Sequence, residues 1–197
     1  DAAFGARLDM AGILVRRGDN DQAQGLYENL LLQANTPARR AEVEFALGEL
    51  REAAGDLQGA LEAYSSIRSR LTLPLERRME AGLGLGRVQL ALGNPAGALE
   101  TATETEALAR SESLQVNLLQ LQIHALQDLG RESEAEALSA QLMTVAGDDE
   151  DARMVAQLEL AQTRTNNGEF QAAIELYREL ESRVSDRPTQ AAMILSV

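Results

Sequence analysis

Apolar residues recur along this chain every three or four positions, the spacing of one face of an α-helix. The segment 57–67 shows it clearly, with Leu57, Ala60, Leu61, Tyr64 and Ile67 on a single stripe. No segment shows the strict alternation of a half-buried strand. The pattern therefore predicts an all-α chain, with helices at residues 3–17, 20–34, 38–54, 57–71, 75–92, 95–109, 112–129, 132–145, 150–167 and 170–184, and a further one from about Thr189.

The helical pattern repeats at a fixed interval, which is best seen from five glycines that each fall between two helices. These turn glycines, spaced 37 or 38 residues apart, are Gly18, Gly55, Gly93, Gly130 and Gly168. An alanine stands five residues after each of them: Ala23, Ala60, Ala98, Ala135 and Ala173. Nine residues after three of them stands a tyrosine: Tyr27, Tyr64 and Tyr177. Such coincidence predicts five units, each a pair of antiparallel helices around a short turn, with the alanines buried where paired helices cross.

This pattern resembles the tetratricopeptide repeat family over essentially the whole chain. The resemblance rests on a small residue at Gly48 or Gly86, on the turn Gly55-Asp56, and on Ala60 with Tyr64. It implies a right-handed α-solenoid of antiparallel helix pairs in one array, with units at about 1–36, 37–73, 74–110, 111–148 and 149–187 and a sixth begun at 188–197. The family period is about 34 residues, so this is a long-period variant. We expect the chain to be a segment of a longer protein.

Composition excludes several kinds of chemistry. The chain has no cysteine and one histidine, and all 18 of its basic residues are arginine. The absence of cysteine and lysine excludes disulfides, thiolate nucleophiles and Schiff-base lysines, and a single histidine disfavours a His-rich metal site. We therefore expect no cofactor, no metal and no enzymatic activity. The net charge of −13 disfavours nucleic acid as a partner, and no apolar stretch is long enough to insert into a membrane. Arginine in place of lysine suggests a GC-rich bacterial genome, with cytoplasm and periplasm both open.

Several local motifs are better explained by helix packing and capping than by a ligand-binding site. The run Gly82-Leu83-Gly84-Leu85-Gly86 lies inside an expected helix and follows no strand, so it does not predict a phosphate loop. Close helix packing explains Gly86, while Gly82 and Gly84 suggest a soft helix or a place where a partner approaches closely. The acidic run 148–151 is expected to cap the helix that follows it.

Two arginine pairs fall at the same place in successive units. Arg39-Arg40 and Arg77-Arg78 are 38 residues apart, so stacking would align them on one edge, near Arg68 and Arg70. One interpretation is surface pairing within the helix, of Arg39 with Glu42 and of Arg40 with Glu44. The other is an edge that receives an acidic partner.

The resemblance also implies where a partner binds. In that family the first helix of each unit lines the concave face and receives peptides or a partner's helix. The candidate partner-binding residues at the matching positions are Phe45, Glu49, Glu52, Leu83, Arg87, Gln120, His124, Gln127 and Gln162. They suit a partner with apolar anchors and some basic groups, held by hydrogen bonds from the glutamines. For Phe45 the alternative is that it fills space between units, and for His124 a polar contact is favoured over a metal.

The sequence thus predicts a non-catalytic scaffold that binds a partner protein or peptide, within a bacterial assembly. Two alternatives remain open. One is a regulatory or substrate-docking arm of a multidomain enzyme. The other is a self-association module, in which the last helix packs against a second copy to give a homo-oligomer.

Overall fold

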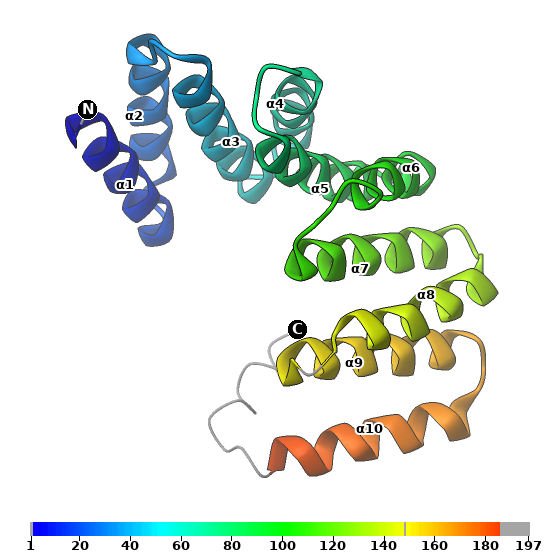
Figure 1. Ribbon diagram of the computed structural model, residues 1–197. Helices are drawn as coiled ribbons and strands as arrows, with labels where there is room; N and C mark the ends of the chain where they lie inside the picture. Colours follow the sequence, from blue (N-terminus) through cyan, green and yellow to red (C-terminus); the bar gives the residue numbers. More distant parts are fainter. Residues whose placement is uncertain (1, 148, 186–197) are drawn as a thin grey trace. The chain divides into compact units, whose positions relative to one another are not determined.

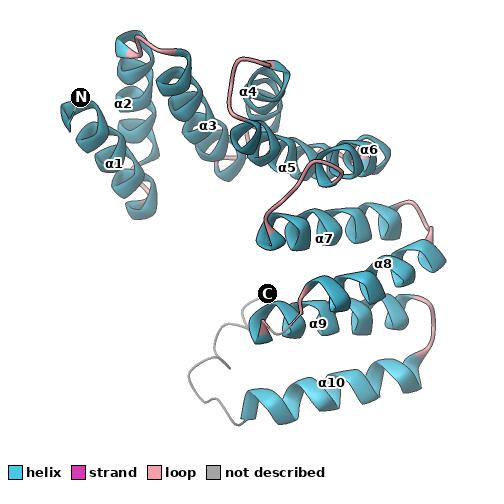
Figure 2. Ribbon diagram, viewed as in Figure 1, coloured by secondary structure: helices cyan, strands magenta, loops and turns pink. Residues whose placement is uncertain are grey.

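A computed structural model describes residues 2–147 and 149–185, and this part of the chain consists of helices joined by short loops, with no strand (Figures 1 and 2). Its ten helices are α1 (Ala2–Arg17), α2 (Asn20–Gln33), α3 (Pro37–Ala53), α4 (Leu57–Ser69), α5 (Leu75–Ala91), α6 (Pro95–Glu106), α7 (Glu112–Asp128), α8 (Glu132–Val145), α9 (Glu150–Asn166) and α10 (Phe170–Ser185). The predicted all-α pattern of helix pairs is therefore confirmed. The helix expected from Thr189, like Pro188, lies outside the described residues.

The predicted helix ends differ from the observed ones mainly at α6, which stops at Glu106 instead of residue 109. Beyond Glu106 the backbone tightens, since the amides of Leu108 and Ala109 bond to carbonyls three residues back, as in the last turn of many helices. Prolines stand at the starts of some of these helices. Pro37 is the first residue of α3 and Pro74 is the N-cap residue of α5, where a missing amide costs little.

The five turn glycines all adopt a left-handed backbone, with φ between 66° and 82°. After each of them, the amide of the next residue bonds to a carbonyl five residues back, for example Asp56 to Arg51 at 2.9 Å. This is the Schellman ending, which favours glycine because other side chains are strained there. Asp56 then caps α4, its side chain accepting from the amide of Gly59. Local interactions at each turn thus fix where the first helix of a pair ends.

The chain divides into two compact units, residues 1–109 with α1–α6 and residues 110–197 with α7–α10. In each unit the two helices of a pair pack together, and the second helix of a pair packs on the first helix of the next. The first helices also touch one another, α1 with α3 and α3 with α5 in one unit, and α7 with α9 in the other. The first helices therefore form a continuous row within each unit.

The alanines predicted to lie at helix crossings are buried. Ala60 and Ala98 are fully buried and Ala173 is 2% exposed, and Ala135 is buried in the same way. Methyl side chains at these positions allow the paired helices to approach closely, and the interior has no room for larger ones.

The buried ring of Tyr64 explains two of the helical glycines. A Cβ atom at Gly48 of α3 would lie 3.0 Å from this ring, and one at Gly84 of α5 would lie 2.8 Å from it. The ring therefore fits between the two first helices because both positions lack a side chain. A Cβ at Gly82 would lie 2.5 Å from the hydroxyl of Thr105 on α6. The prediction that Gly82 and Gly84 leave room for a partner is wrong, since the chain's own side chains occupy both places.

Candidate functional site

The first helices of the N-terminal unit bring five predicted residues onto one side of α3 and α5. We call this set, Phe45, Glu49, Glu52, Leu83 and Arg87, the α3–α5 surface. Phe45, Leu83 and Glu52 are half-buried, whereas Glu49 and Arg87 are exposed. The surface thus combines two apolar side chains with charges of both signs.

Glu52 lies at the centre of the polar contacts on this surface. Its carboxylate accepts two hydrogen bonds from the Arg87 guanidinium, at 3.1 and 3.0 Å, and one from the Tyr64 hydroxyl at 2.9 Å. Paired, bidentate contacts of this kind are stronger and more directional than single ones. The hydrogen bond to Glu52 raises the pKa of Arg87, and burial raises that of Tyr64. Glu52 therefore joins α3, α4 and α5 in one fixed geometry.

Glu49, one turn before Glu52, has no hydrogen bond or ion pair with any described residue. Neighbouring protein atoms partly shield its carboxyl from water and raise its pKa. Arg87 lowers that pKa, while the negative charge of Glu52 raises it further. A carboxylate in this situation gains from a cation brought by a partner, because the partner supplies the interaction that water supplies poorly there.

Phe45 packs against the core and carries a cation on its outer side. Its ring meets the Tyr64 ring edge-on, with centroids 5.5 Å apart, and the Arg77 guanidinium lies 5.4 Å above its centroid. These contacts agree with the alternative interpretation, in which Phe45 fills space between repeat units. Its role as a partner anchor stays a prediction.

One of the ion pairs that the sequence predicts within α3, that of Arg40 with Glu44, does not form. Glu44 forms its ion pair with Arg70, at 2.7 Å, and not with Arg40. Both partners are half-buried, whereas Arg40 is exposed. Arg70 is the C-cap residue of α4, so it reaches Glu44 from a neighbouring helix. Arg39 bonds to Asn35 and lies over the Phe4 ring. The expected Arg40–Glu44 pair is wrong, because register along one helix does not reveal what a neighbouring helix brings.

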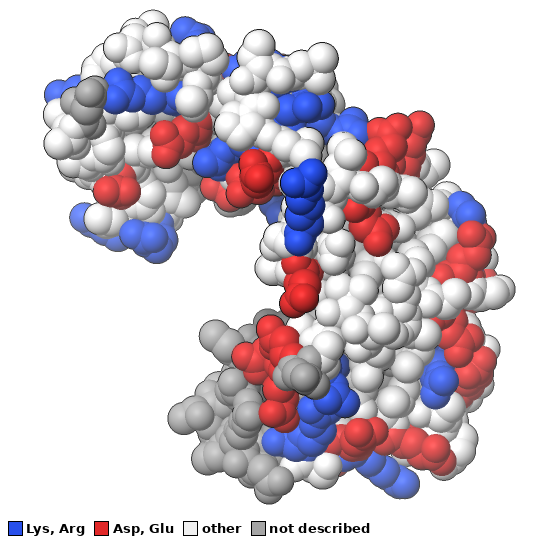
Figure 3. Space-filling model, in the orientation of Figure 1, with Lys and Arg blue, Asp and Glu red and all other residues white. Residues whose placement is uncertain are grey.

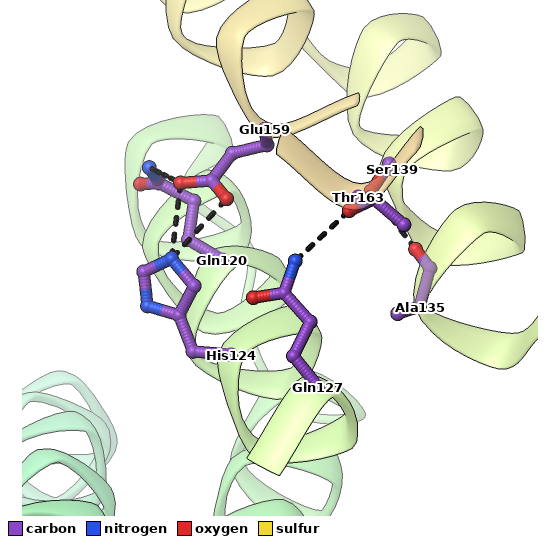
Figure 4. A network of polar contacts seen from close by, with 7 residues as sticks. All are labelled: Gln120, His124, Gln127, Ala135, Ser139, Glu159 and Thr163. Atoms are coloured by element: carbon purple, nitrogen blue, oxygen red, sulfur yellow. Dashed lines mark hydrogen bonds and ion pairs between the residues drawn. The ribbon is translucent and has the colours of Figure 1, made fainter. Parts of the chain in front are cut away.

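The C-terminal unit places three of the other predicted residues, Gln120, His124 and Gln127 of α7, in contact with α9, and Figure 4 shows these contacts. The fourth, Gln162, lies on α9 itself. We call Gln120, His124, Gln127 and Gln162 the α7–α9 surface. Glu159, which is 6% exposed, accepts from the Gln120 amide at 3.2 Å and lies 3.2 Å from the His124 Nε2. Carboxylates are rarely this buried unless they are paired, and here two donors from α7 satisfy the group.

A second polar contact lies beside the first, also between the helices of this unit (Figure 4). The Gln127 amide donates to the Thr163 hydroxyl at 3.0 Å, and the Ser139 hydroxyl lies 3.2 Å from the same oxygen. Ser139 and Thr163 are fully buried. The side-chain amides of Gln120 and Gln127 therefore each donate a hydrogen bond within the protein. Gln162 is exposed.

Sequence reasoning missed Glu159, although the repeat register carries a signal for it. Nine residues before the turn glycine, three of the other four units have the apolar or small residues Ala46, Gly84 and Leu121, and the first unit has Asp9. A glutamate inside the array, at a position that is apolar or small in the three units before it, indicates a buried carboxylate with partners of its own. Ser139 gives the same kind of signal, because it stands where Tyr27, Tyr64 and Tyr177 stand in other units.

We expect replacement of His124 by Gln to remove a pH-dependent part of the stability. The hydrogen bond to Glu159 raises the pKa of His124 above its usual value of 6.5, against a smaller opposing effect of burial. A raised pKa in the folded state stabilises the fold fully below about pH 6.5 and progressively less as the pH rises through the folded-state value. The melting temperature of His124→Gln should therefore fall below that of the parent at about pH 6 and approach it at alkaline pH. An equal difference at both pH values would contradict this.

The charged side chains on the face drawn in Figure 3 are interspersed, red beside blue, with uncharged surface between them. Within the described ranges there is no group of three or more His, Asp or Glu residues that could hold a metal ion. No helix among the described residues is long and apolar enough to cross a membrane.

Comparison with known proteins identifies the repeat. Residues 8–71 match the family model described as tetratricopeptide repeat. This segment therefore carries the tetratricopeptide repeat pattern. This matched segment holds the first two turn glycines, Gly18 and Gly55, and most of the first two helix pairs. No curated protein sequence matches the chain.

Solved structures of tetratricopeptide repeat proteins share the helical repeat solenoid of this chain. The nearly identical TPR-like repeats of a protein described as a kinesin light chain from Podosopora anserina match 94% of this chain and 97% of their own, with a TM-score of 0.80 and 22% identity. TTC0263, a thermophilic TPR protein from Thermus thermophilus, gives a TM-score of 0.64 at 19% identity, over 98% and 97%. YrrB, described as a TPR protein with an unusual peptide-binding site, gives 0.60 at 15% identity, over 97% and 91%. At these identities the likeness shows the fold.

Proposed function

We propose that this protein is a non-catalytic interaction scaffold within a bacterial assembly, and that its first helices bind a segment of a partner protein. Tetratricopeptide repeats form a protein-interaction fold, and YrrB, which shares it, is described as having a peptide-binding site. The partner-binding residues that we propose are the α3–α5 surface in one unit and the α7–α9 surface in the other, each taken by itself.

The observation that carries the proposal is Glu49, an exposed carboxylate without an ion-pair partner among the described residues. It lies on a surface that is otherwise rigid, because Glu52 holds Arg87 and Tyr64 in place. A preorganised surface loses little conformational entropy on binding. The α3–α5 surface therefore suits a partner segment that brings a lysine or arginine to Glu49 and an apolar side chain to Leu83.

Selection from a library of random displayed peptides tests this on the purified chain. We expect the selected peptides to combine basic and apolar residues, and to bind Glu49→Arg about ten-fold more weakly than the parent, since attraction for the peptide's cation is replaced by repulsion. The matched control is Glu62→Arg, which makes the same change at an exposed glutamate of the second helix α4 and should leave binding unchanged.

The proposal fails if the selected peptides bind Glu49→Arg as tightly as the parent protein. It also fails for this surface if both variants weaken binding equally, because that result reports net charge and not a site. Circular dichroism of both variants should show the parent's helical signal, so that loss of binding is not loss of fold.

A further inference from the structure

An open pocket of about 350 Å³ lies in the N-terminal unit, between α4, α5 and α6. It is distinct from the α3–α5 surface and shares none of its residues. The lining residues that matter here are Ser65 and Arg68 from α4, Arg78, Leu75 and Met79 from α5, and Leu108 after α6. Cavities of this size are at the small end of those that hold ligands. It has room for one or two side chains.

The polar part of the pocket has donors that the protein itself does not use. Arg78 donates from its Nε to the Arg68 carbonyl at 3.0 Å, and its two terminal nitrogens have no partner among the described residues. Ser65 likewise makes no hydrogen bond with the described residues through its hydroxyl. By contrast, the Arg68 guanidinium is paired with Glu104 of α6. The pocket thus offers one open guanidinium, fixed at its Nε and half-buried.

The rest of the lining is apolar. Leu75 is half-buried and Met79 is 5% exposed, whereas Leu108 is 51% exposed. Covering the exposed Leu108 side chain with a ligand is favourable, because apolar surface is removed from water. The ligand that this lining suits therefore has an apolar group next to the group that meets Arg78.

The charges decide between kinds of anion. The two free nitrogens of a guanidinium match the two oxygens of a carboxylate, which they can bind side by side. A phosphate would bring a second negative charge close to Glu104, which also lines the pocket, and Arg68 is already neutralised by that residue. Because only Arg78 of the pocket is without an anionic partner among the described residues, and Arg68 is paired with Glu104, the pocket favours a ligand group with a single negative charge.

We propose that this pocket binds a carboxylate of an acidic peptide, with Arg78 as the anion contact and an adjacent apolar side chain seated against Leu75, Met79 and Leu108. The edge that carries Arg78 then receives an acidic partner, in addition to the basic segment proposed for the first helices. The carboxylate comes from a glutamate or aspartate side chain or from a chain end.

Nuclear magnetic resonance titration of the ¹⁵N-labelled chain tests the proposal with defined peptides. The first probe is the N-acetylated, C-amidated peptide Gly-Leu-Glu-Leu-Gly, and the second has Gln in place of Glu. We expect the first to shift the amide signals of Ser65, Met79 and Leu108 and to bind about ten-fold more tightly than the second, since only a carboxylate makes charge-assisted hydrogen bonds to Arg78. A third probe, Gly-Leu-Leu with a free C-terminus, shows whether a chain end serves better than a side chain.

The variants separate the pocket from general charge effects. Arg78→Gln should weaken the glutamate peptide about ten-fold. Arg40→Gln should not, although Arg40 stands at the same place one unit earlier, because it is exposed and lines no part of this pocket. Leu108→Ala should also weaken binding while retaining the parent's melting temperature, and it keeps the test valid if Arg78→Gln folds poorly.

Four results would overturn the proposal. They are unchanged pocket signals with either carboxylate peptide, equal binding of the glutamate and glutamine peptides, equal losses in Arg78→Gln and Arg40→Gln, and displacement of the peptide by inorganic phosphate at equal concentration. The last would show a general anion site.

Discussion

Replacement of Tyr64 by alanine is expected to lower the stability of the N-terminal unit by about 3–5 kcal/mol, as for other large aromatic side chains in cores. The ring is fully buried between Gly48 and Gly84, neither of which has a side chain that could fill the space. Its hydroxyl bond to Glu52 is lost as well. Urea unfolding followed by circular dichroism measures the change.

The repeat supplies a matched control for this experiment. Tyr177 stands at the same position as Tyr64 in its own unit but is 38% exposed, so Tyr177→Ala should cost clearly less. Tyr64→Phe keeps the ring and removes only the hydroxyl, and should cost about 1 kcal/mol. Equal losses in Tyr64→Ala and Tyr177→Ala would show that repeat position, and not burial between two glycines, sets the contribution.

Replacement of Ala135 by leucine is expected to destabilise the C-terminal unit by about 1–3 kcal/mol through overpacking. Ala135 is fully buried in α8, and its carbonyl accepts a bond from the buried Ser139 hydroxyl at 2.8 Å. Ala60→Leu, at the same repeat position in the N-terminal unit, should behave alike. Thermal unfolding of each variant measures the effect.

Ala137, on the same helix, is the control because it is exposed. Ala137→Leu changes helix propensity and side-chain size in the same way, without entering the core, and should alter stability by less than about 0.5 kcal/mol. Should Ala135→Leu unfold at the parent's temperature, the alanine register would not mark the helix crossings.

The candidate site was predictable only in part. The first-helix positions that the family resemblance implies did place Glu52 with Arg87, and Gln120 with His124, on shared surfaces of their respective units. Which partners these residues contact was not predictable: the repeat register marks Glu159 as an unusual residue, but it does not say which side chains Glu159 meets. Glu159 and Thr163, which bind the α7 side chains, come from a helix whose rotation about its own axis no local pattern specifies.

The sequence alone determined the helices, their turns and the buried alanines, because each of these depends on interactions within a few residues. A glycine that must adopt a positive φ, as Gly55 does, and an apolar stripe at helical spacing are visible in any short window. Only the tertiary structure decided which helix brings a partner to a given side chain. Glu44 pairs with Arg70, the C-cap residue of α4, instead of Arg40 of its own helix, and the Tyr64 ring fills the space left by Gly84. The reason is that such contacts depend on the distance and rotation between packed helices, which the packing of the whole unit sets.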